Sequence, residues 1–359
     1  MKRSGMTLLA FLLAASLLFD GCSGLRSIRE DSVQENLPQI DPEAGTARDF
    51  TATMYYWLAN EPYLVPIRHS ITVGSNESAE DAIVRTLLSG GPPLAENVKN
   101  AFPEGTEALD ITRDGSILYI TLSEEYLDDS GLRDETENAE QLLSKNEITQ
   151  EVYDARIANA TEALYIQRRA GLYAIVNSIT AYDPSVRVML SVNRKGVGAE
   201  RLRYDEIGII NTGEAASSLL EPMEFQDGVI ATPDHIVECI FRRMQRGEFE
   251  MIYELFAETE NGGMQKPLYA DFEEQLSSLG RLASYTVHSP ASQNAESAFV
   301  AVDLELVDAT GTVQRITGAQ LELKSEGNIY RVSFHAFLAA LSETKVQAED
   351  SEQQNGGAA

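Results

Sequence analysis

The chain has 359 residues, of which 43% are apolar. This length exceeds one ordinary hydrophobic core, so two folded domains are expected. The formal net charge of −28 at pH 7 repels nucleic acid phosphates and anionic lipid headgroups, and the longest basic runs are only pairs of residues. Such pairs are typical of solvated helix or turn positions, so the composition argues against nucleic acid as a partner.

The N-terminus has the pattern of an export signal. Lys2 and Arg3 precede an apolar run from Met6 to Phe19, and a cysteine follows at Cys22. The run is short for a stable span of a hydrocarbon layer of about 30 Å. Residues 18–22, LFDGC, resemble a bacterial lipobox, although the second and third positions usually hold leucine and a small residue. We therefore predict a signal peptide over residues 1–21 and lipidation of Cys22, and the alternative is an uncleaved anchor.

The following stretch, residues 22–50, is polar and acidic and is interrupted by Pro38, Pro42 and Gly45. This composition predicts a flexible tether. A lipid of two or more acyl chains holds a protein at a membrane surface, because each buried CH₂ contributes about 0.8 kcal/mol. We expect a palmitate-bearing lipoprotein on the extracytoplasmic face of the cell membrane.

Cys239 is the second of the two cysteines in the chain. If Cys22 is acylated, no intramolecular disulfide is possible. Cys239 lies in a predicted helix beside Ile236, Val237 and Ile240, so the pattern favours a buried, inert thiol over a nucleophile.

Residues 163–193 organise the first predicted domain. Apolar residues at i, i+3, i+4 and i+7, beginning at Leu172, predict an amphipathic helix with one inward face. Asp183-Pro184 ends this helix, because proline disfavours helical geometry in the preceding residue. Alternating apolar residues from Val186 to Val192 then predict a half-buried strand.

The segment before residue 163 supplies further elements. Strands are predicted at 54–58 and 64–73, followed by a helix that begins at Ser78 and ends in the SGGPP run at 89–93. The strongest hairpin signal joins residues 107–113 to 116–122 through Asp114-Gly115, a dipeptide that favours a type I′ turn.

Turns and apolar positions in this half of the chain follow the pattern of a known family. The matching stretches are Tyr55-Tyr56, LVPIR at 64–68, TLLSGGP at 86–92, FPEGT at 102–106, LSEEY at 122–126, AIVNSIT at 174–180 and 186–193. They resemble the GerMN domain, which is named for sporulation and spore germination. The resemblance covers roughly residues 53–208 and implies a helix-on-sheet domain, here bounded at 51–208. The family's usual glycine after the last strand is replaced near residues 193–196.

A second departure from the family is a segment at 129–160 that we interpret as an insertion. It is acidic and is expected to merge into an extended helix. Its acidic residues lack the D-x-[DN]-x-[DN]-G spacing of a calcium loop, so we interpret them as a solvated face. The residues concerned are Asp128, Asp129, Asp134 and Glu135.

Residues 209–227 mix Gly, Ser, Glu and Pro and are predicted to be a linker to a second domain at 228–342. Thr232 is expected to cap a helix that has Pro233 in its first turn and stops at Gly247. Two more helices are predicted at 248–257 and 268–279. Four strands are predicted at 282–289, 298–306, 313–324 and 328–334.

Helices followed by an antiparallel meander resemble the NTF2-like α+β cone. Some cones are isomerases that use a buried carboxylate and a tyrosine, and Tyr253 and Asp271 are the residues to test for those roles, although core and surface positions explain them better. The fold class predicted for the whole chain is therefore α+β, with a disordered acidic tail at 343–359.

No pattern in the sequence indicates catalysis. The histidines, His69, His235, His288 and His335, form no H-E-x-x-H motif or Cys/His cluster, and G-x-S-x-G, Walker A and G-x-G-x-x-G motifs are absent. We therefore expect no enzyme, catalytic residue, cofactor or metal.

Three hypotheses for the function remain. The leading one is a non-enzymatic envelope lipoprotein that acts as an interaction or assembly module in sporulation or germination, with envelope or sporulation proteins or its own copies as partners. The alternative is a ligand-binding lipoprotein that uses the C-terminal cone. A cell-wall hydrolase or its accessory is the third.

Overall fold

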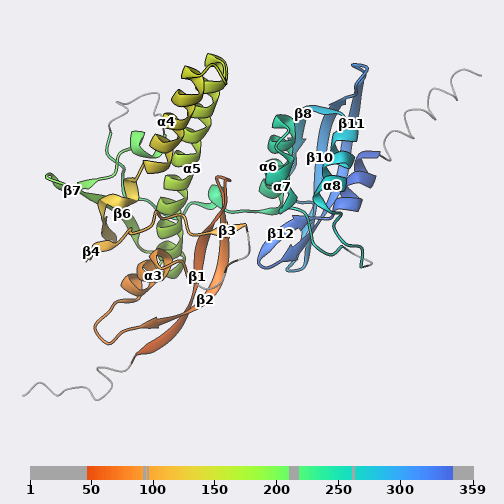
Figure 1. Cartoon of the computed structure of the whole chain (residues 1–359). Helices are drawn as coiled ribbons and strands as arrows, with labels where there is room; N and C mark the ends of the chain where they lie inside the picture. Colours follow the sequence, from red (N-terminus) through yellow and green to blue (C-terminus); the bar gives the residue numbers. More distant parts are fainter. Residues whose placement is uncertain (1–46, 92–93, 95–96, 210–217, 261–262, 343–359) are drawn as a thin grey trace, which may run out of the picture. The chain divides into compact units, whose positions relative to one another are not determined.

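The computed structural model describes residues 47–91, 94, 97–209, 218–260 and 263–342. Within these residues the protein has the α+β fold expected from the sequence, with three β-sheets and helices packed on them (Figure 1). The predicted signal peptide, Cys22, almost all of the predicted tether and the predicted C-terminal tail lie outside the described residues. Among the described residues, no helix has the length and apolar character needed to cross a membrane.

The first sheet is formed near the start of the described chain. It contains β1 (Arg48–Leu58), β2 (Leu64–Val73) and the short β3 (Val98–Lys99), in the order β2-β1-β3. Helix α3 (Ala79–Leu88) follows β2 and begins with a capping box, in which Ser78 and Asp81 each accept a hydrogen bond from the other's backbone N–H. Both strands and the helix lie where the sequence predicts them, with β1 beginning earlier.

The second sheet has the order β4-β5-β6-β7. Strands β5 and β6 are parallel, so a long crossover must connect them. The other neighbouring strands in this sheet run antiparallel. The four strands are β4 (Ala108–Asp114), β5 (Ile117–Leu122), β6 (Arg187–Arg194) and β7 (Gly198–Arg201).

The β4–β5 hairpin forms as predicted, but its turn differs from the prediction. Asp114 pairs with Ile117, so the two-residue loop is Gly115-Ser116 and not Asp114-Gly115. Only Gly115 in this loop has a positive φ, of 59°. A glycine in the first central position is the pattern of a type II′ turn, which also matches the twist of the strands.

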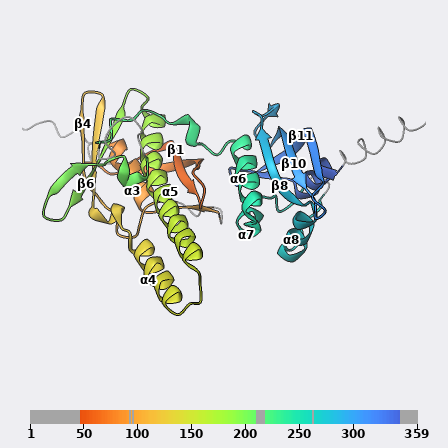
Figure 2. The same cartoon turned by 90° about the horizontal axis from the view of Figure 1, so that it is seen from above.

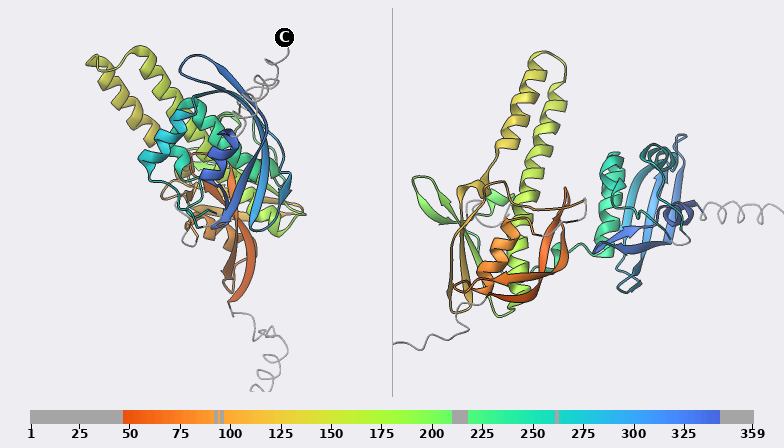
Figure 3. Two further views of the ribbon diagram at one scale, coloured as in Figure 1. Left: turned by 90° about the vertical axis from the view of Figure 1, so that its right-hand side faces the viewer. Right: turned by 60° about the horizontal axis from the view of Figure 1, so that its bottom comes forward.

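The crossover from β5 to β6 contains a short 3₁₀ helix η1 (Glu124–Leu127) and two helices, α4 (Ser130–Ser144) and α5 (Gln150–Tyr182). Helix α4 and the first half of α5 form an antiparallel hairpin that projects from the sheets (Figure 3). The predicted extended helix is therefore present, since α5 runs for 33 residues without a break. It ends at Tyr182, before Pro184, as predicted.

The C-terminal half of α5 packs on both sheets. Leu172, Ile175 and Ile179 are each no more than 1% exposed, and alternate residues of β6 from Val188 to Val192 are equally buried. The backbone N–H of Tyr55 in β1 donates to Ser178 Oγ at 3.0 Å. Each fully buried aliphatic side chain contributes about 1.5–3 kcal/mol, so this half of the helix holds the two sheets together.

Residues 218–230, most of which we predicted as linker, extend the edge of the second sheet. Met223 forms an antiparallel bridge with Val188. The backbone N–H of Leu220 donates to Leu202 O at 2.8 Å. The amide of Asn177 on α5 both donates to and accepts from the backbone of Gln226, at 2.8 Å each. A short 3₁₀ helix, η2 (Asp205–Ile207), precedes this stretch, and a second, η3 (Asp227–Val229), lies within it.

The C-terminal part contains helices α6 (Pro233–Arg246), α7 (Phe249–Tyr253) and α8 (Tyr269–Ser278) and a sheet of order β12-β11-β10-β8. Helix α6 contacts β8, β10 and β12 (Figure 2). The meander of four predicted strands is present, and a two-residue strand also pairs with β10. The strands are β8 (Arg281–Val287), β9 (Ser292–Gln293), β10 (Ser297–Val307), β11 (Val313–Glu326) and β12 (Ile329–Val332).

Two local predictions for this part are wrong. The helix predicted at 248–257 ends at Tyr253, because Phe256 instead forms a parallel bridge with Val332 and joins the sheet. Thr232 occupies the cap position of α6, but its hydroxyl makes no capping hydrogen bond and is buried without a partner. Pro233 at the first helical position removes one of the N–H groups that a cap would satisfy.

Candidate functional sites

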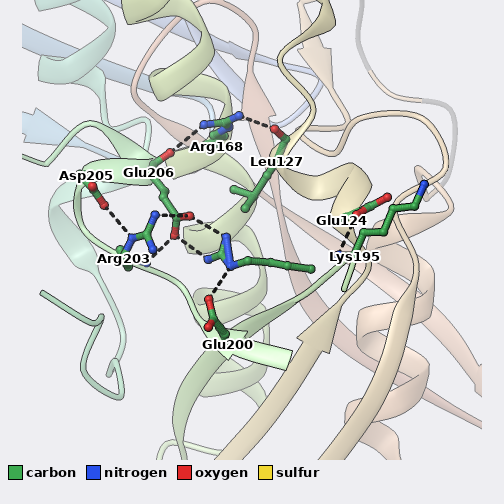
Figure 4. A network of polar contacts seen from close by, with 9 residues as sticks. Glu124, Leu127, Arg168, Lys195, Glu200, Arg203, Asp205 and Glu206 are labelled. Atoms are coloured by element: carbon green, nitrogen blue, oxygen red, sulfur yellow. Dashed lines mark hydrogen bonds and ion pairs between the residues drawn. The ribbon is translucent and has the colours of Figure 1, made fainter. Parts of the chain in front are cut away.

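The most extensive polar network near the second sheet is centred on Glu206 (Figure 4). Arg194, at the end of β6, donates from Nη1 to Glu206 Oε1 at 2.8 Å and from Nη2 to Oε2 at 3.0 Å. Arg203 adds its backbone N–H to Oε2 at 2.8 Å and an ion pair from Nη2 to Oε1 at 3.2 Å. Four donors thus occupy the four lone-pair positions of one carboxylate, which leaves none for a substrate proton.

Arg168 of α5 connects this network to the helix. Its guanidinium donates to the backbone oxygen of Glu206 at 3.0 Å and to the backbone oxygen of Leu127. The hydroxyl of Tyr126 donates to Arg168 O at 2.6 Å, and burial raises the pKa of Tyr126 above its ordinary value. Bidentate and charge-assisted contacts of this kind fix geometry. The network therefore fastens residues 194–207 to α5 and is a structural feature.

A second polar cluster lies in the C-terminal part. The carboxylate of Glu260 is 4% exposed and accepts from the backbone N–H of His335 at 3.0 Å, and its Oε1 lies 3.0 Å from His335 Nδ1. Lys266 donates to Glu258 and to Tyr253 O, and its Nζ lies 3.9 Å from the centre of the Tyr253 ring. The Lys266 ammonium is thus paired with Glu258, and the buried Glu260 carboxylate is hydrogen-bonded, as buried polar groups require.

The residues considered for isomerase chemistry are not brought together. The hydroxyl of Tyr253 donates to Pro267 O at 2.8 Å, while Asp271 is exposed on α8. Among the described residues, no hydrogen bond joins the two. Cys239 is fully buried in α6, and burial raises the pKa of its thiol well above the ordinary value. A thiol that stays protonated is a poor nucleophile, in accord with the prediction of an inert cysteine.

The four histidines lie apart in the structure. His235 Nδ1 contacts Ile230 O at 2.5 Å, and His288 Nε2 lies 2.8 Å from Asp303 Oδ2. His335 belongs to the Glu260 cluster described above, and His69 is partly exposed on β2. Within the described ranges, no three His, Cys, Asp or Glu side chains are placed to hold a metal ion, and this includes Asp128, Asp129, Asp134 and Glu135.

The space between the helices and the sheet of the C-terminal part is filled by aromatic rings. Phe256 lies within 5.1 to 5.5 Å, centre to centre, of three other phenylalanine rings, in edge-to-face geometry. These rings are each fully buried: Phe256, Phe272, Phe334 and Phe337. Edge-to-face pairs of this kind are typical of a packed core, so this interior offers little room for the ligand of our alternative hypothesis.

A pocket of about 430 Å³ lies at the base of the α4–α5 hairpin and was not predicted from the sequence. Trp57 and Asn60 reach it from the end of β1, Glu104 from the loop before β4, and Asp128 from the residues before α4. Gln167 reaches it from α5. These residues lie in four separate segments of the chain, so no local motif could reveal the pocket. The only signal was that Trp57 is the single tryptophan in the chain.

Comparison with known proteins supports part of the predicted resemblance. Residues 53–145 match the family described as Germane, sporulation and spore germination. The match begins within β1 and includes β2, α3, β3, β4, β5 and all of α4. It therefore includes the first half of the segment that we interpreted as an insertion. The expected last helix and strand of the family, at 174–193, lie beyond the matched residues.

No curated protein matches the chain. Among solved structures, a variant of Rv3472, a function-unknown protein from Mycobacterium tuberculosis, is similar at 11% identity and a TM-score of 0.20. The alignment covers 27% of this chain and 66% of that one. A likeness this low does not inform the fold of this chain.

Proposed function

We propose that this protein is a non-enzymatic, membrane-anchored envelope lipoprotein that acts as an interaction or assembly module in sporulation or spore germination. The observation that carries the proposal is the match of residues 53–145 to the sporulation and spore germination family. The lipobox-like sequence that ends at Cys22 supports attachment to the membrane. The order of helices and strands in the C-terminal part supports an NTF2-like domain there.

The polar clusters support the non-enzymatic part of this proposal. The carboxylate of Glu206 has four donors, and Glu260 and Lys266 are engaged by their neighbours. Catalytic groups need a free lone pair or proton within reach of a substrate. Side chains committed to internal contacts stabilise the fold and leave function to the surface.

Incorporation of radiolabelled palmitate tests the proposed lipidation of Cys22 and attachment to the membrane. The wild-type chain, expressed in a spore-forming bacterium, should become labelled and fractionate with membranes. Cys22→Ala should lose the label, whereas the matched variant Cys239→Ala should keep it. Equal labelling of wild type and Cys22→Ala would contradict lipidation at Cys22.

Capture of partners tests the mode of action. The protein purified without residues 1–22 should self-associate or retain a defined envelope protein from sporulating cells. Incubation with purified peptidoglycan should release no soluble fragments. Strictly monomeric behaviour with no retained partner would contradict the proposal, and release of fragments would contradict it in favour of the third hypothesis.

A further inference from the structure

The pocket at the base of the α4–α5 hairpin is lined by polar side chains that have no partner within the described protein. Within the described part of the chain, the side chains of Asn60, Glu104 and Gln167 form no hydrogen bond or ion pair, although all three line the pocket. Polar groups around a concave site that are not used by the fold are available to a ligand. The pocket therefore differs from the Glu206 network, where donors and acceptors are matched.

The chemistry of the lining limits the class of ligand. It contains amides, which both donate and accept, and the carboxylates of Glu104 and Asp128, which accept; it contains no Lys or Arg. Anionic ligands are disfavoured, because there is no cation to pair with them and the whole chain carries a charge of −28. The mixture of donors and acceptors in the amides suits a neutral ligand rich in hydroxyl groups.

Apolar surface forms the rest of the pocket. Pro103, Leu132 and Leu164 face the same space, and Trp57 lies against it. Trp57 is 8% exposed, and its indole N–H already donates to Glu61 O at 2.7 Å, so this donor is not available to a ligand. Apolar patches beside amides and carboxylates match a pyranose ring, whose C–H faces are apolar and whose rim carries hydroxyls.

The size of the pocket agrees with this class. Its volume of about 430 Å³ lies within the usual range for small-molecule sites of about 300–1,000 Å³. Asp128 is held in place at its edge, since it accepts hydrogen bonds from the backbone N–H and hydroxyl of Ser130. The Ser130 hydroxyl, which makes the largest contribution, keeps the pKa of Asp128 below its ordinary value.

We propose that this pocket binds a neutral oligosaccharide segment, with Asn60, Glu104 and Gln167 as its hydrogen-bonding residues. The inference stands on the residues of the pocket alone and does not depend on the lipid anchor proposed above. The proposal concerns binding only and includes no reaction of the saccharide.

Titration of the full chain in a sugar-free detergent tests the proposal, with chitotetraose and cellotetraose as probes. Trp57 is the sole tryptophan in the chain and lines this pocket, so its emission is the first signal to follow, and the Glu104 and Gln167 variants assign any change to this pocket. Calorimetry is run in parallel, because a ligand can bind without changing the emission. At least one saccharide should give saturable binding.

Three variants should weaken that binding by about tenfold each, the loss of roughly one hydrogen bond of 1.4 kcal/mol. They are Gln167→Leu, Glu104→Gln and Asn60→Gly, the last because Asn60 has a φ of 65° that glycine tolerates. Gln141→Leu, on the exposed part of α4, is the matched control and should bind as wild type does. Unfolding curves confirm that each variant is folded.

Two outcomes would overturn the proposal. One is the absence of saturable binding of both saccharides in calorimetry. The other is equal affinity of the wild type and all three pocket variants, which would place any binding elsewhere. If a lysine-containing peptide binds in the same assay and the saccharides do not, the two carboxylates serve a cationic peptide and the saccharide assignment is wrong.

Discussion

The two halves of α5 belong to one helix but have opposite environments. From Ala170 to Thr180 nearly every residue is buried between the two sheets, whereas none of residues 150–169 is fully buried. The outer half packs along α4, with Arg156 bound to Glu135 at 2.6 Å, and at its inner end Arg168 and Arg169 donate to the backbone oxygens of Glu206 and Ile207. Burial and not helix propensity therefore sets where stability resides along this helix. The outer half is left to form one wall of the pocket.

Truncation of one isoleucine in each half should give the largest contrast. Ile175→Ala removes a fully buried side chain, so the free energy of unfolding should fall by about 2–5 kcal/mol. Ile157→Ala, in the half-buried seam of the hairpin, should cost less than about 1 kcal/mol. Urea denaturation measures both values. Equal losses of unfolding free energy would contradict the conclusion that the half of α5 between the sheets contributes more to stability than the outer half.

Substitution of Gly208 by alanine tests how closely the segment after β7 approaches the middle of α5. Its φ is 68°, and a Cβ at this position would lie 2.4 Å from Cγ of Tyr165. Gly208→Ala should therefore lower the free energy of unfolding by about 1–3 kcal/mol through strain and overlap. Gly196→Ala is the control, since its φ is 78° and nothing lies within 4 Å of the added carbon. A smaller loss at Gly208 than at Gly196 would contradict the close approach.

Glu206→Gln tests the network that fastens residues 194–207 to α5. Replacement of one accepting oxygen by an NH₂ group leaves Arg194 and Arg203 facing a donor, and the side chain of Glu206 is only 12% exposed. We expect a loss of about 1–2 kcal/mol, discounted for partial solvent contact. Glu200→Gln, at 45% exposure, should change stability by less than about 0.5 kcal/mol. Thermal unfolding at low and high salt distinguishes the two.

Replacement of Tyr56 by phenylalanine should have the smallest effect on the free energy of unfolding at neutral pH and a clear effect at alkaline pH. Its hydroxyl is buried without a hydrogen-bond partner, and burial raises its pKa from 10.0 to about 12. Above pH 10 the unfolded chain loses this proton while the folded chain keeps it, so stability falls as pH rises from 10 towards 12. Tyr56→Phe should unfold within about 1 kcal/mol of wild type at pH 7 and lose part of this alkaline decline. An unchanged pH profile would contradict the assignment.

The parts of the fold with strong periodicity were accessible from the sequence. The apolar face that begins at Leu172 and the alternation from Val186 to Val192 each predict an element that the structure contains, because burial of one face imposes that spacing. The β4–β5 hairpin was predicted as well, while the register of its turn was not. A one-residue shift is decided by pairing with the neighbouring strand, which a dipeptide does not encode.

The Glu206 network and the pocket could not be predicted from the sequence in this way. Arg194 and Glu206 lie in a polar stretch without periodicity, and their pairing depends on the path of the chain through β7. The pocket brings together Trp57, Glu104 and Gln167, which are separated by dozens of residues and belong to different elements. Contacts between distant segments follow from the tertiary fold, so local patterns could exclude catalytic motifs but could not locate this pocket.

Chemical crosslinking in cells during sporulation, with the tagged full chain, tests the central claim most directly. We expect the chain to be recovered in defined covalent complexes with an envelope protein or with its own copies, and these complexes should diminish in Cys22→Ala, which would lack the proposed anchor. Recovery of only the uncrosslinked chain, together with turnover of an envelope substrate by the purified protein, would contradict it.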